Sequence, residues 1–580
     1  MSEASLDHPA RWGAHIVSSG RARFAIWAPD RDEVLLELDG QPPLAMDRDG
    51  GWFTVVTNAA PGARYRFRLS HDLIVPDPAS RAQASDVHGW SLLVDPDAYV
   101  WQCKDWQGRP WHETIIYEVH AGLAGGFRAL MDQLPALAAL GITAIEIMPV
   151  AAFSGTRNWG YDGVLPYAPA SAYGTPDDLK ALVDRAHACG LMIFLDVVYN
   201  HFGPDGNYMP AYASGFFHPE VETPWGAAIA FDRPEVADFF IDNARMWIEE
   251  YRLDGLRFDA VHAIGDTDFL DRMACAIRAG AGRRQVHLVL ENETNDAKRL
   301  GDGHYDAQWN DDFHNVLHVL LSGETESYYR DFADRPAERL ARCLGEGFIY
   351  QGEGSPNQNG KPRGTPSGHL PPTAFVSFLQ NHDQVGNRAM GERLLKLATP
   401  ARLKAATALL LLSPQIPRLF MGEEEGSDSP FLFFTDFHDQ LANAVREGRR
   451  AEFAGHSAFS DPERRAAIPD PNAHETFHVS RPRPGPEGDD WRAFYRELIA
   501  LRHAWIVPRL SGSSSIDACA IGDEAVMGRW AMGDGAELCL ALNLGDEPVR
   551  FDMPAAAPFF SVGESMAGKL APRSLQAWLG

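Results

Sequence analysis

The most constraining feature of this chain is a series of short apolar strands that alternate with amphipathic helices from residue 114 to about residue 420. Sustained alternation of this kind predicts an α/β fold whose parallel strands are joined by right-handed crossovers. Eight strand candidates favour a closed (β/α)8 TIM barrel over an open sheet. They lie at 115–119, 144–150, 191–200, 254–260, 286–292, 306–309, 375–381 and 417–420.

Both ends of the chain show a different pattern, of short β-type runs divided by Gly, Pro and Asp clusters. We expect an immunoglobulin-like β-sandwich over residues 1–100, the barrel with loop insertions over 101–508, and a small C-terminal β-sandwich over 509–580. The Ser-rich stretch 511–515 is interpreted as a linker. The N-terminal strand candidates are 22–29, 33–40, 51–57 and 63–70.

Charge and cysteine usage limit the possible partners and compartment. Acidic residues outnumber basic ones by 79 to 52, a net charge of −27, which disfavours binding to nucleic acid or to an anionic membrane. The six cysteines form no CxxC pair, and the first fifteen residues carry no signal-peptide pattern. The longest apolar stretch, around 405–412, is too short to span a bilayer. We therefore expect a cytoplasmic protein.

Three predicted strands end in carboxylates: Asp259, Glu291 and Asp383. The functional residues of such barrels lie at the C-terminal ends of the strands. Glycoside hydrolysis needs one protonated and one ionised carboxyl group on either side of the anomeric carbon. Arg257 lies two residues before Asp259 and shares its face of the strand, so its guanidinium is expected to keep Asp259 ionised.

Four short segments at these strand ends resemble, in order, the four characteristic regions of the α-amylase family: 196–201, 255–262, 290–293 and 378–383. The resemblance implies that Asp259 is the nucleophile, Glu291 the general acid and base, and Asp383 a stabiliser of the transition state. It also implies that His201, Arg257 and His382 line the first glucose subsite and that Tyr161 stacks on the sugar.

Segments 145–169, 196–208, 223–232, 306–314 and 430–437 resemble one subfamily, the maltooligosyltrehalose trehalohydrolases. This implies retaining cleavage of the α-1,4 bond next to a terminal α,α-trehalose, with release of trehalose. It also implies a functional pairing with the synthase that forms the maltooligosyltrehalose. Trp309 and Phe313 would offer apolar faces to sugars, unless they are core residues. The expected substrate-binding residues are Trp159, Tyr161, His201, Arg257, His262, Asp311, Asp312, Phe313, His314, His382, Gln384 and Asn387.

The chain departs from the subfamily pattern at three places. Asn315 replaces a usual second histidine, Glu425 replaces a common tryptophan, and the 120–127 loop is shorter. None of these departures involves the three carboxylates. A glucan transferase such as a branching enzyme, with the same acids, remains the alternative function, and a non-catalytic glucan-binding protein is a third.

Two possible metal motifs are set aside. The HETFH sequence at 474–478 matches the HExxH zinc pattern, but prolines on both sides favour a loop or strand over the helix that this motif requires. Asn200 corresponds to a calcium-binding position in many α-amylases, yet no convincing set of six to eight oxygen ligands accompanies it. We predict no metal and no cofactor.

Overall fold

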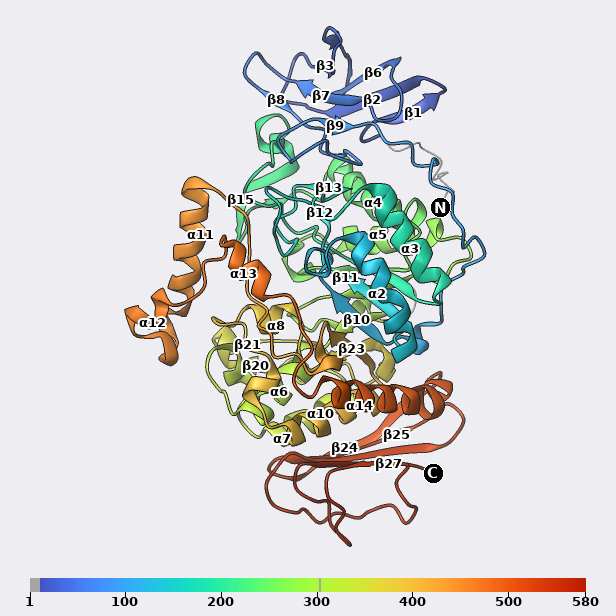
Figure 1. The fold of residues 1–580 in the computed structure, drawn as a ribbon, viewed down its shortest axis with the longest axis vertical. Helices are drawn as coiled ribbons and strands as arrows, with labels where there is room; N and C mark the ends of the chain where they lie inside the picture. The colour runs from blue at the N-terminus through green and yellow to red at the C-terminus, as the bar shows by residue number, and fades with distance from the viewer. Residues whose placement is uncertain (1–10, 302–303) are drawn as a thin grey trace.

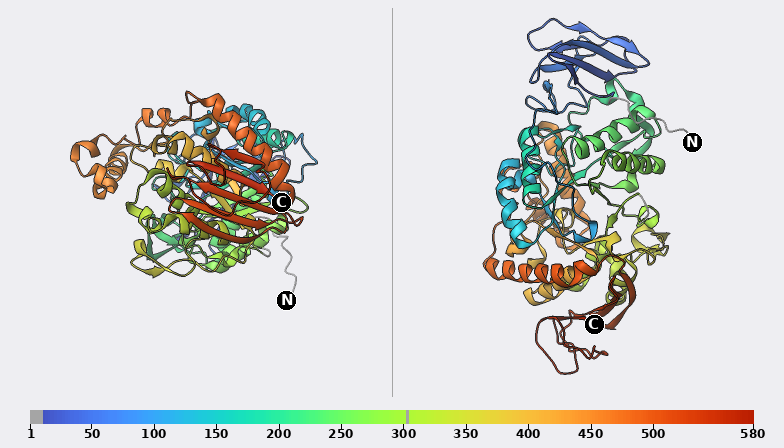
Figure 2. Two further views of the ribbon diagram at one scale, coloured as in Figure 1. Left: turned by 90° about the horizontal axis from the view of Figure 1, so that it is seen from below. Right: turned by 90° about the vertical axis from the view of Figure 1, so that its right-hand side faces the viewer.

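The computed structural model describes residues 11–301 and 304–580. Two β-sheets of the N-terminal part lie at one end of an elongated molecule, the barrel and its helices occupy the middle, and a C-terminal sheet closes the other end (Figures 1 and 2). In the described part of the chain, no helix is long and apolar enough to cross a membrane. The expectation that no leader peptide is present falls largely on residues 1–10, outside the described ranges.

The predicted eight-stranded parallel barrel is confirmed. Its strands pair in chain order and the last pairs with the first. Nearly every strand residue is buried, as expected for strands covered on both faces. The strands are β10 (Ile116–Val119), β11 (Ala144–Ile147), β14 (Met192–Val197), β17 (Gly255–Phe258), β18 (His287–Leu290), β19 (Ala307–Trp309), β22 (Phe375–Phe378) and β23 (Ile416–Phe420).

The helices around the barrel begin at recognisable caps. Thr175 accepts a hydrogen bond from the Asp178 N–H at 3.1 Å and donates its own N–H to the Asp178 carboxylate at 3.0 Å, which forms a capping box at the start of α3. The main helices are α2 (Phe127–Leu140), α3 (Pro176–Ala188), α4 (Pro234–Glu249), α5 (Thr267–Gly280), α6 (Asp311–Ser322), α7 (Pro336–Glu346), α10 (Pro400–Leu412) and α14 (Gly488–Leu501). Shorter helices are α1 (Ala121–Ala124), α8 (His382–Gly386), α9 (Leu394–Leu397), α12 (Pro462–Ala466) and α13 (His474–Val479), and α11 (Asp439–Glu452) projects beside the barrel (Figure 1).

The N-terminal part forms two antiparallel sheets, as predicted. One has the order β1-β2-β6-β5 and the other β4-β3-β7-β8, with β9 paired to β7. Trp12 contacts the barrel side, because its ring meets Phe239 at 4.8 Å and its indole N–H donates to the Glu235 carbonyl at 3.2 Å. The strands are β1 (His15–Ser18), β2 (Arg21–Trp27), β3 (Leu35–Leu38), β4 (Leu44–Ala45), β5 (Asp47–Asp49), β6 (Trp52–Asn58), β7 (Arg64–Arg68), β8 (Ile74–Val75) and β9 (Ser91–Leu92).

The C-terminal part differs from the prediction in two respects. Over 509–580, all of which is described, the named strands form one five-stranded antiparallel sheet with the order β24-β25-β26-β28-β27, where a two-sheet sandwich was expected. Its inner face packs on helices α7 and α10, which take the place of a second sheet. The expected linker is also partly strand, since β24 begins at Ser514. The strands are β24 (Ser514–Gly522), β25 (Ala525–Ala531), β26 (Glu537–Asn543), β27 (Phe560–Val562) and β28 (Ser574–Leu579).

Candidate active site

Asp259 and Glu291 meet at the C-terminal ends of the adjacent strands β17 and β18, around one buried guanidinium. Arg257 Nη1 lies 2.8 Å from Asp259 Oδ1, and Nη2 lies 2.9 Å from Glu291 Oε2. Ala260 has a left-handed backbone conformation with φ of 42°, and its N–H donates to Glu291 Oε2 at 2.7 Å. Carboxylates that share a guanidinium lie close together, as in retaining glycosidases, whose two carboxyl groups are about 5 Å apart.

Arg257 contacts other carboxylates besides Asp259, so its charge does not act on Asp259 alone. Arg257 Nη1 also donates to both carboxylate oxygens of Asp196, at 2.8 and 2.7 Å. One positive charge is thus divided among three carboxylates. The ring of Trp309 packs on the guanidinium at 3.8 Å and is 1% exposed, so it belongs to the barrel core and offers no face to a sugar.

The predicted contact between Arg257 and Asp259 is present, and Arg257 favours the ionised form of Asp259, but burial and two other carboxylates act against it. Burial raises the pKa of Asp259 well above its ordinary value; Arg257 opposes this, while Glu291 and Asp196 add to it. For Glu291, burial acts in the same direction, but Arg257 and the Ala260 N–H outweigh it and lower the pKa. The two carboxyl groups therefore titrate as a coupled pair around Arg257.

Asp383 lies in the first turn of α8, which follows β22, two strands from β18 in the barrel, and its side chain is 40% exposed. Asn387, one helical turn later, donates to Asp383 Oδ1 at 2.9 Å. His382 Nε2 lies 4.0 Å from the same oxygen. The third carboxylate is thus the most open of the three.

Tyr161 and His382 form an aromatic wall beside the carboxylates. Their rings are stacked with centroids 5.0 Å apart, and the Tyr161 hydroxyl donates to Asp196 Oδ2 at 2.6 Å. Gly160, just before Tyr161, allows the chain to pass close to Pro149, because a Cβ there would lie 2.1 Å from the Pro149 carbonyl oxygen. Tyr161 is half-buried, so part of its surface remains accessible.

The aromatic residues beyond this wall differ in how exposed they are. His201 Nε2 lies 2.9 Å from the Tyr161 carbonyl oxygen, and the His201 ring stacks on Trp225 at 4.8 Å. Trp225, at the tip of the hairpin β15 (Phe217–Thr223) and β16 (Gly226–Ile229), is 44% exposed and was not predicted. Trp159 is 5% exposed and packs between His382 and Phe431, so it supports the wall from behind.

A pocket of about 270 Å³ lies against Glu291 and Asp383. It brings together four further residues that the sequence indicated: His262, Asp311, Gln384 and Asn387. Gln384 donates to Asp311 at 3.3 Å. Burial, followed by the charges of Glu291 and Asp383, raises the pKa of Asp311 to about 8. The sequence analysis missed further lining residues, among them Tyr328, Asn357, Gln358 and Arg363 from the segments around α7.

The expectation that residues 311–314 all contact substrate is wrong for three of the four. These residues open helix α6, where successive residues point in different directions, and Asp312, Phe313 and His314 are buried. Asp311 and Asn315 therefore line the pocket, and Asn315, one of the departures from the subfamily pattern, takes a place there. Phe313 is 0% exposed in the hydrophobic core.

Asp312 and His314 are buried structural residues. Asp312 pairs with Arg363 at 3.1 Å and accepts hydrogen bonds from Asn295, Ile349 N–H and Tyr350 N–H. It thereby anchors the 349–350 segment and the pocket-lining Arg363. His314 Nδ1 lies 2.5 Å from the Leu379 carbonyl oxygen, and burial lowers its pKa well below the ordinary value.

Two other features lie away from the carboxylates. Glu425 Oε1 pairs with Arg492 of α14 at 2.5 Å, so this residue, where the chain departs from the subfamily pattern, contacts a helix.

The HETFH segment forms the short helix α13, contrary to the predicted loop or strand. Its six residues lie between Pro471 and Pro482 and form fewer than two helical turns. Among the described residues, no cluster of three His, Cys, Asp or Glu side chains could hold a metal.

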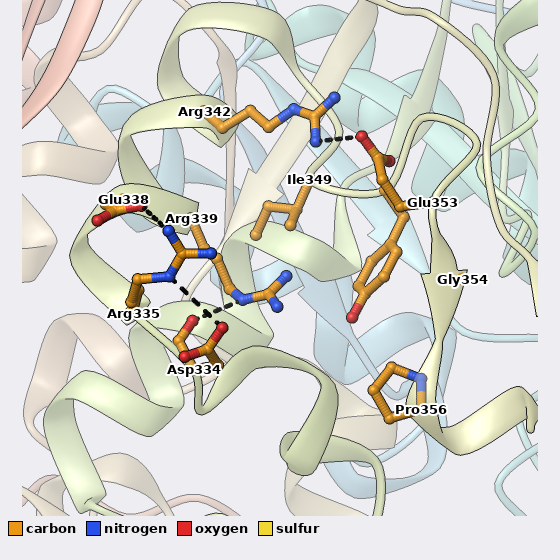
Figure 3. Close-up of a pocket in the computed structure, with 10 residues that line it drawn as sticks. Asp334, Arg335, Glu338, Arg339, Arg342, Ile349, Glu353, Gly354 and Pro356 are labelled. Carbon is orange, nitrogen blue, oxygen red and sulfur yellow. Dashed lines mark hydrogen bonds and ion pairs between the residues drawn. The ribbon is translucent and has the colours of Figure 1, made fainter. Parts of the chain in front are cut away.

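A second cavity, of about 310 Å³, lies between α7 and the 349–356 segment (Figure 3). Its charged side chains pair with one another: Arg335 with Glu338 at 2.8 Å and Arg342 with Glu353 at 2.6 Å. None of the predicted site residues lines this cavity.

Comparison with known proteins agrees with the geometry. A family model described as the α-amylase catalytic domain matches residues 80–222, and a domain of unknown function, DUF3459, matches 514–577. The chain is 40% identical over 515 residues to the malto-oligosyltrehalose trehalohydrolase of Deinococcus radiodurans, covering 86% of this chain and 83% of that protein.

Two further relatives differ in identity and in how much of the chain they cover. A solved structure titled putative alpha amylase from Salmonella typhimurium is 47% identical, covers 99% of this chain and 100% of its own, and has a TM-score of 0.93. A 1,4-alpha-glucan branching enzyme of Bacillus caldolyticus is 34% identical over 287 residues, only 43% of either protein. The chain therefore belongs to the malto-oligosyltrehalose trehalohydrolase family, within the α-amylase family.

Proposed function

We propose that this protein is a retaining glycoside hydrolase that cleaves the α-1,4 bond next to the terminal α,α-trehalose of maltooligosyltrehalose. Free trehalose and a shortened maltooligosaccharide would result. The observation that carries the proposal is the 40% identity over most of the chain to a trehalohydrolase, combined with three carboxylates at the mouth of the barrel.

In the proposed reaction, Asp259 attacks the anomeric carbon while Glu291 gives its proton to the departing glycosidic oxygen. The productive state therefore has the proton on Glu291 and an ionised Asp259. Substrate favours this state for two reasons. Its glycosidic oxygen accepts a hydrogen bond only from a protonated Glu291, and positive charge growing at the anomeric carbon favours an ionised Asp259. Water then enters, and Glu291 removes its proton to release the sugar from Asp259.

The glucose that reacts would lie against Tyr161 and His382, with Asp383 and Asn387 holding its hydroxyls. The leaving trehalose would occupy the 270 Å³ pocket on the side of Glu291, where Asp311, Gln384 and Arg363 offer polar groups. A disaccharide without a reducing end is recognised by fixed hydrogen-bonding groups, since an analogue that leaves them unpaired binds much less well.

Transfer of the glucan to another sugar, as in a branching enzyme, is the second candidate. It uses the same glycosyl-enzyme intermediate and differs in whether a sugar hydroxyl or water intercepts it. The partial match to a branching enzyme, over 43% of the chain, gives this candidate less support than the trehalohydrolases have.

The test is to give the protein maltooligosyltrehalose and, in a parallel reaction, a maltooligosaccharide of equal length, and to separate the products. We expect free trehalose from the first substrate and much slower cleavage of the second. Absence of trehalose would refute the assignment, and α-1,6-linked products would favour transfer.

The proposed cellular setting follows from the substrate and the thiols. All six cysteines are free in the structure, which suits a reducing compartment such as the cytoplasm. Its substrate must come from an enzyme that converts the reducing end of a maltooligosaccharide into trehalose, so we place the protein after such a synthase in trehalose biosynthesis.

A further inference from the structure

His382 is held by a residue from the opposite end of the barrel sequence. Glu118, the third residue of β10, accepts two hydrogen bonds from it: Oε1 from the ring Nδ1–H at 2.5 Å and Oε2 from the backbone N–H at 3.1 Å. Both side chains are almost fully buried. A ring bound through Nδ1–H has only its Nε2 atom left to face the site, and this atom lies 4.0 Å from Asp383 Oδ1.

Glu118 is itself held in place by Arg418 of β23, a buried side chain that forms an ion pair with Glu118 Oε1. Arg418 Nε also lies 3.0 Å from Glu146 Oε1 on β11, and the guanidinium packs on Trp309 at 4.0 Å. Trp309 thus lies between Arg418 on one side and Arg257 on the other. The barrel interior therefore carries a fixed array of charges that connects His382 to Arg418.

We propose that Glu118, anchored by Arg418, is a positioning residue that fixes His382 as a doubly protonated donor with Nε2–H directed into the first glucose subsite. The inference rests on the proposed function, because the subsite is defined by that reaction. A charged donor gives stronger hydrogen bonds to sugar hydroxyls than a neutral ring does, and it lies beside the carboxylates where charge changes during the reaction.

Several groups face His382 and could set its charge. Glu118 on β10 and Asp383 on α8 favour the charged ring, whereas Arg257 on β17 disfavours it. Further charged or titratable groups around His382 are Tyr161, which stacks on the ring, Asp196 on β14, Glu291 on β18, Arg418 on β23 and His120 before α1. Burial opposes the charge, yet the carboxylates prevail and the pKa of His382 is raised. Arg418 and His382 in turn hold the pKa of Glu118 down to about 2 despite its burial.

The test compares Glu118→Gln with Glu146→Gln. Each variant leaves Arg418 with one carboxylate, but only the first removes the charge next to His382. The glutamine oxygen can still accept from Nδ1–H, whereas its NH2 group cannot accept from the His382 backbone N–H. The variant therefore keeps the hydrogen bond to the ring while the pKa of the ring falls. The profile of kcat/KM against pH for maltooligosyltrehalose is measured for both variants and for the wild-type protein, together with a thermal melt.

At pH values below the lowered pKa of His382, where the ring is protonated in every form, Glu118→Gln should approach wild-type activity. As the pH rises through the lowered pKa of His382, its kcat/KM should fall to about one-tenth to one-hundredth of wild type, chiefly through kcat. Glu146→Gln should keep the wild-type profile. Parallel pH profiles for the two variants would overturn the inference.

A second variant covers the case in which Glu118→Gln folds poorly. Glu118→Asp keeps the charge at a longer distance, so its loss should be constant with pH, and a pH-dependent loss would contradict the proposal. If the wild-type protein cleaves no maltooligosyltrehalose at all, the proposed function fails; if it does and Glu118→Gln matches Glu146→Gln, only this inference fails.

Discussion

The adjacent residues Asp311 and Asp312 should respond in opposite ways to the same substitution. Asp312 is fully buried and pairs with the buried Arg363, while Asp311 lines the pocket and accepts a hydrogen bond from Gln384. Asp312→Asn removes the charge that compensates Arg363. Loss of one partner of a buried ion pair costs about 3–5 kcal/mol in the free energy of unfolding. We expect a loss in this range for Asp312→Asn.

Asp311→Asn should have the reverse effect on stability. The pKa of Asp311 is raised to about 8 in the folded protein, whereas an unfolded aspartate titrates near pH 4. Between these values, the folded state binds more protons than the unfolded state, so the wild-type protein loses stability as the pH rises from 4 to 8. Asparagine cannot ionise. The variant should therefore gain stability relative to wild type across that window, and most at pH 8.

The assay is urea denaturation of both variants at pH 5 and pH 8, combined with KM and kcat for maltooligosyltrehalose. Asp312→Asn should unfold at lower urea at both pH values. Asp311→Asn should not, but its KM or kcat should change because it faces the leaving group. If Asp312→Asn impaired catalysis while leaving stability unchanged, Asp312 would be a substrate contact and the assignment from helix geometry would be wrong.

Three further predictions concern other parts of the site. Asp259→Asn should lower kcat by several orders of magnitude while circular dichroism shows an intact fold; near-normal turnover would exclude Asp259 as the nucleophile. Phe313→Ala should cost about 3–5 kcal/mol in stability, because it empties a core position, and should leave KM unchanged in steady-state kinetics. Treatment with EDTA should leave activity unchanged; a loss that Ca²⁺ or Zn²⁺ restores would reveal a required metal.

Much of the fold and the position of the three acids could be predicted because both depend on local pattern. Apolar runs of strand length, each followed by an amphipathic helix, specify a parallel barrel, and the acids directly follow such runs. The N-caps Thr175 of α3 and Thr399 of α10 are equally local features, because an N-cap depends on only the next three residues.

What could not be predicted depends on which distant residues meet. Asp196 and Glu291 divide the charge of Arg257, and neither is near it in the chain, so the pKa order of the acids was not readable from the Arg257–Asp259 spacing. Glu118 and His382 are separated by 264 positions. The prediction that residues 311–314 all contact substrate failed for a different reason. Helix periodicity was available in the sequence, and four consecutive helical residues cannot all face one pocket.

The most direct test of the central claim is proton NMR of a maltooligosyltrehalose digest, recorded from the first minutes of the reaction. It reports trehalose release and the anomeric form of the new reducing end in one experiment. The account predicts free trehalose together with an α-anomer that later mutarotates, as a covalent intermediate on Asp259 requires. An initial β-anomer would contradict the double displacement, and glucose or maltose without trehalose would contradict the site of cleavage.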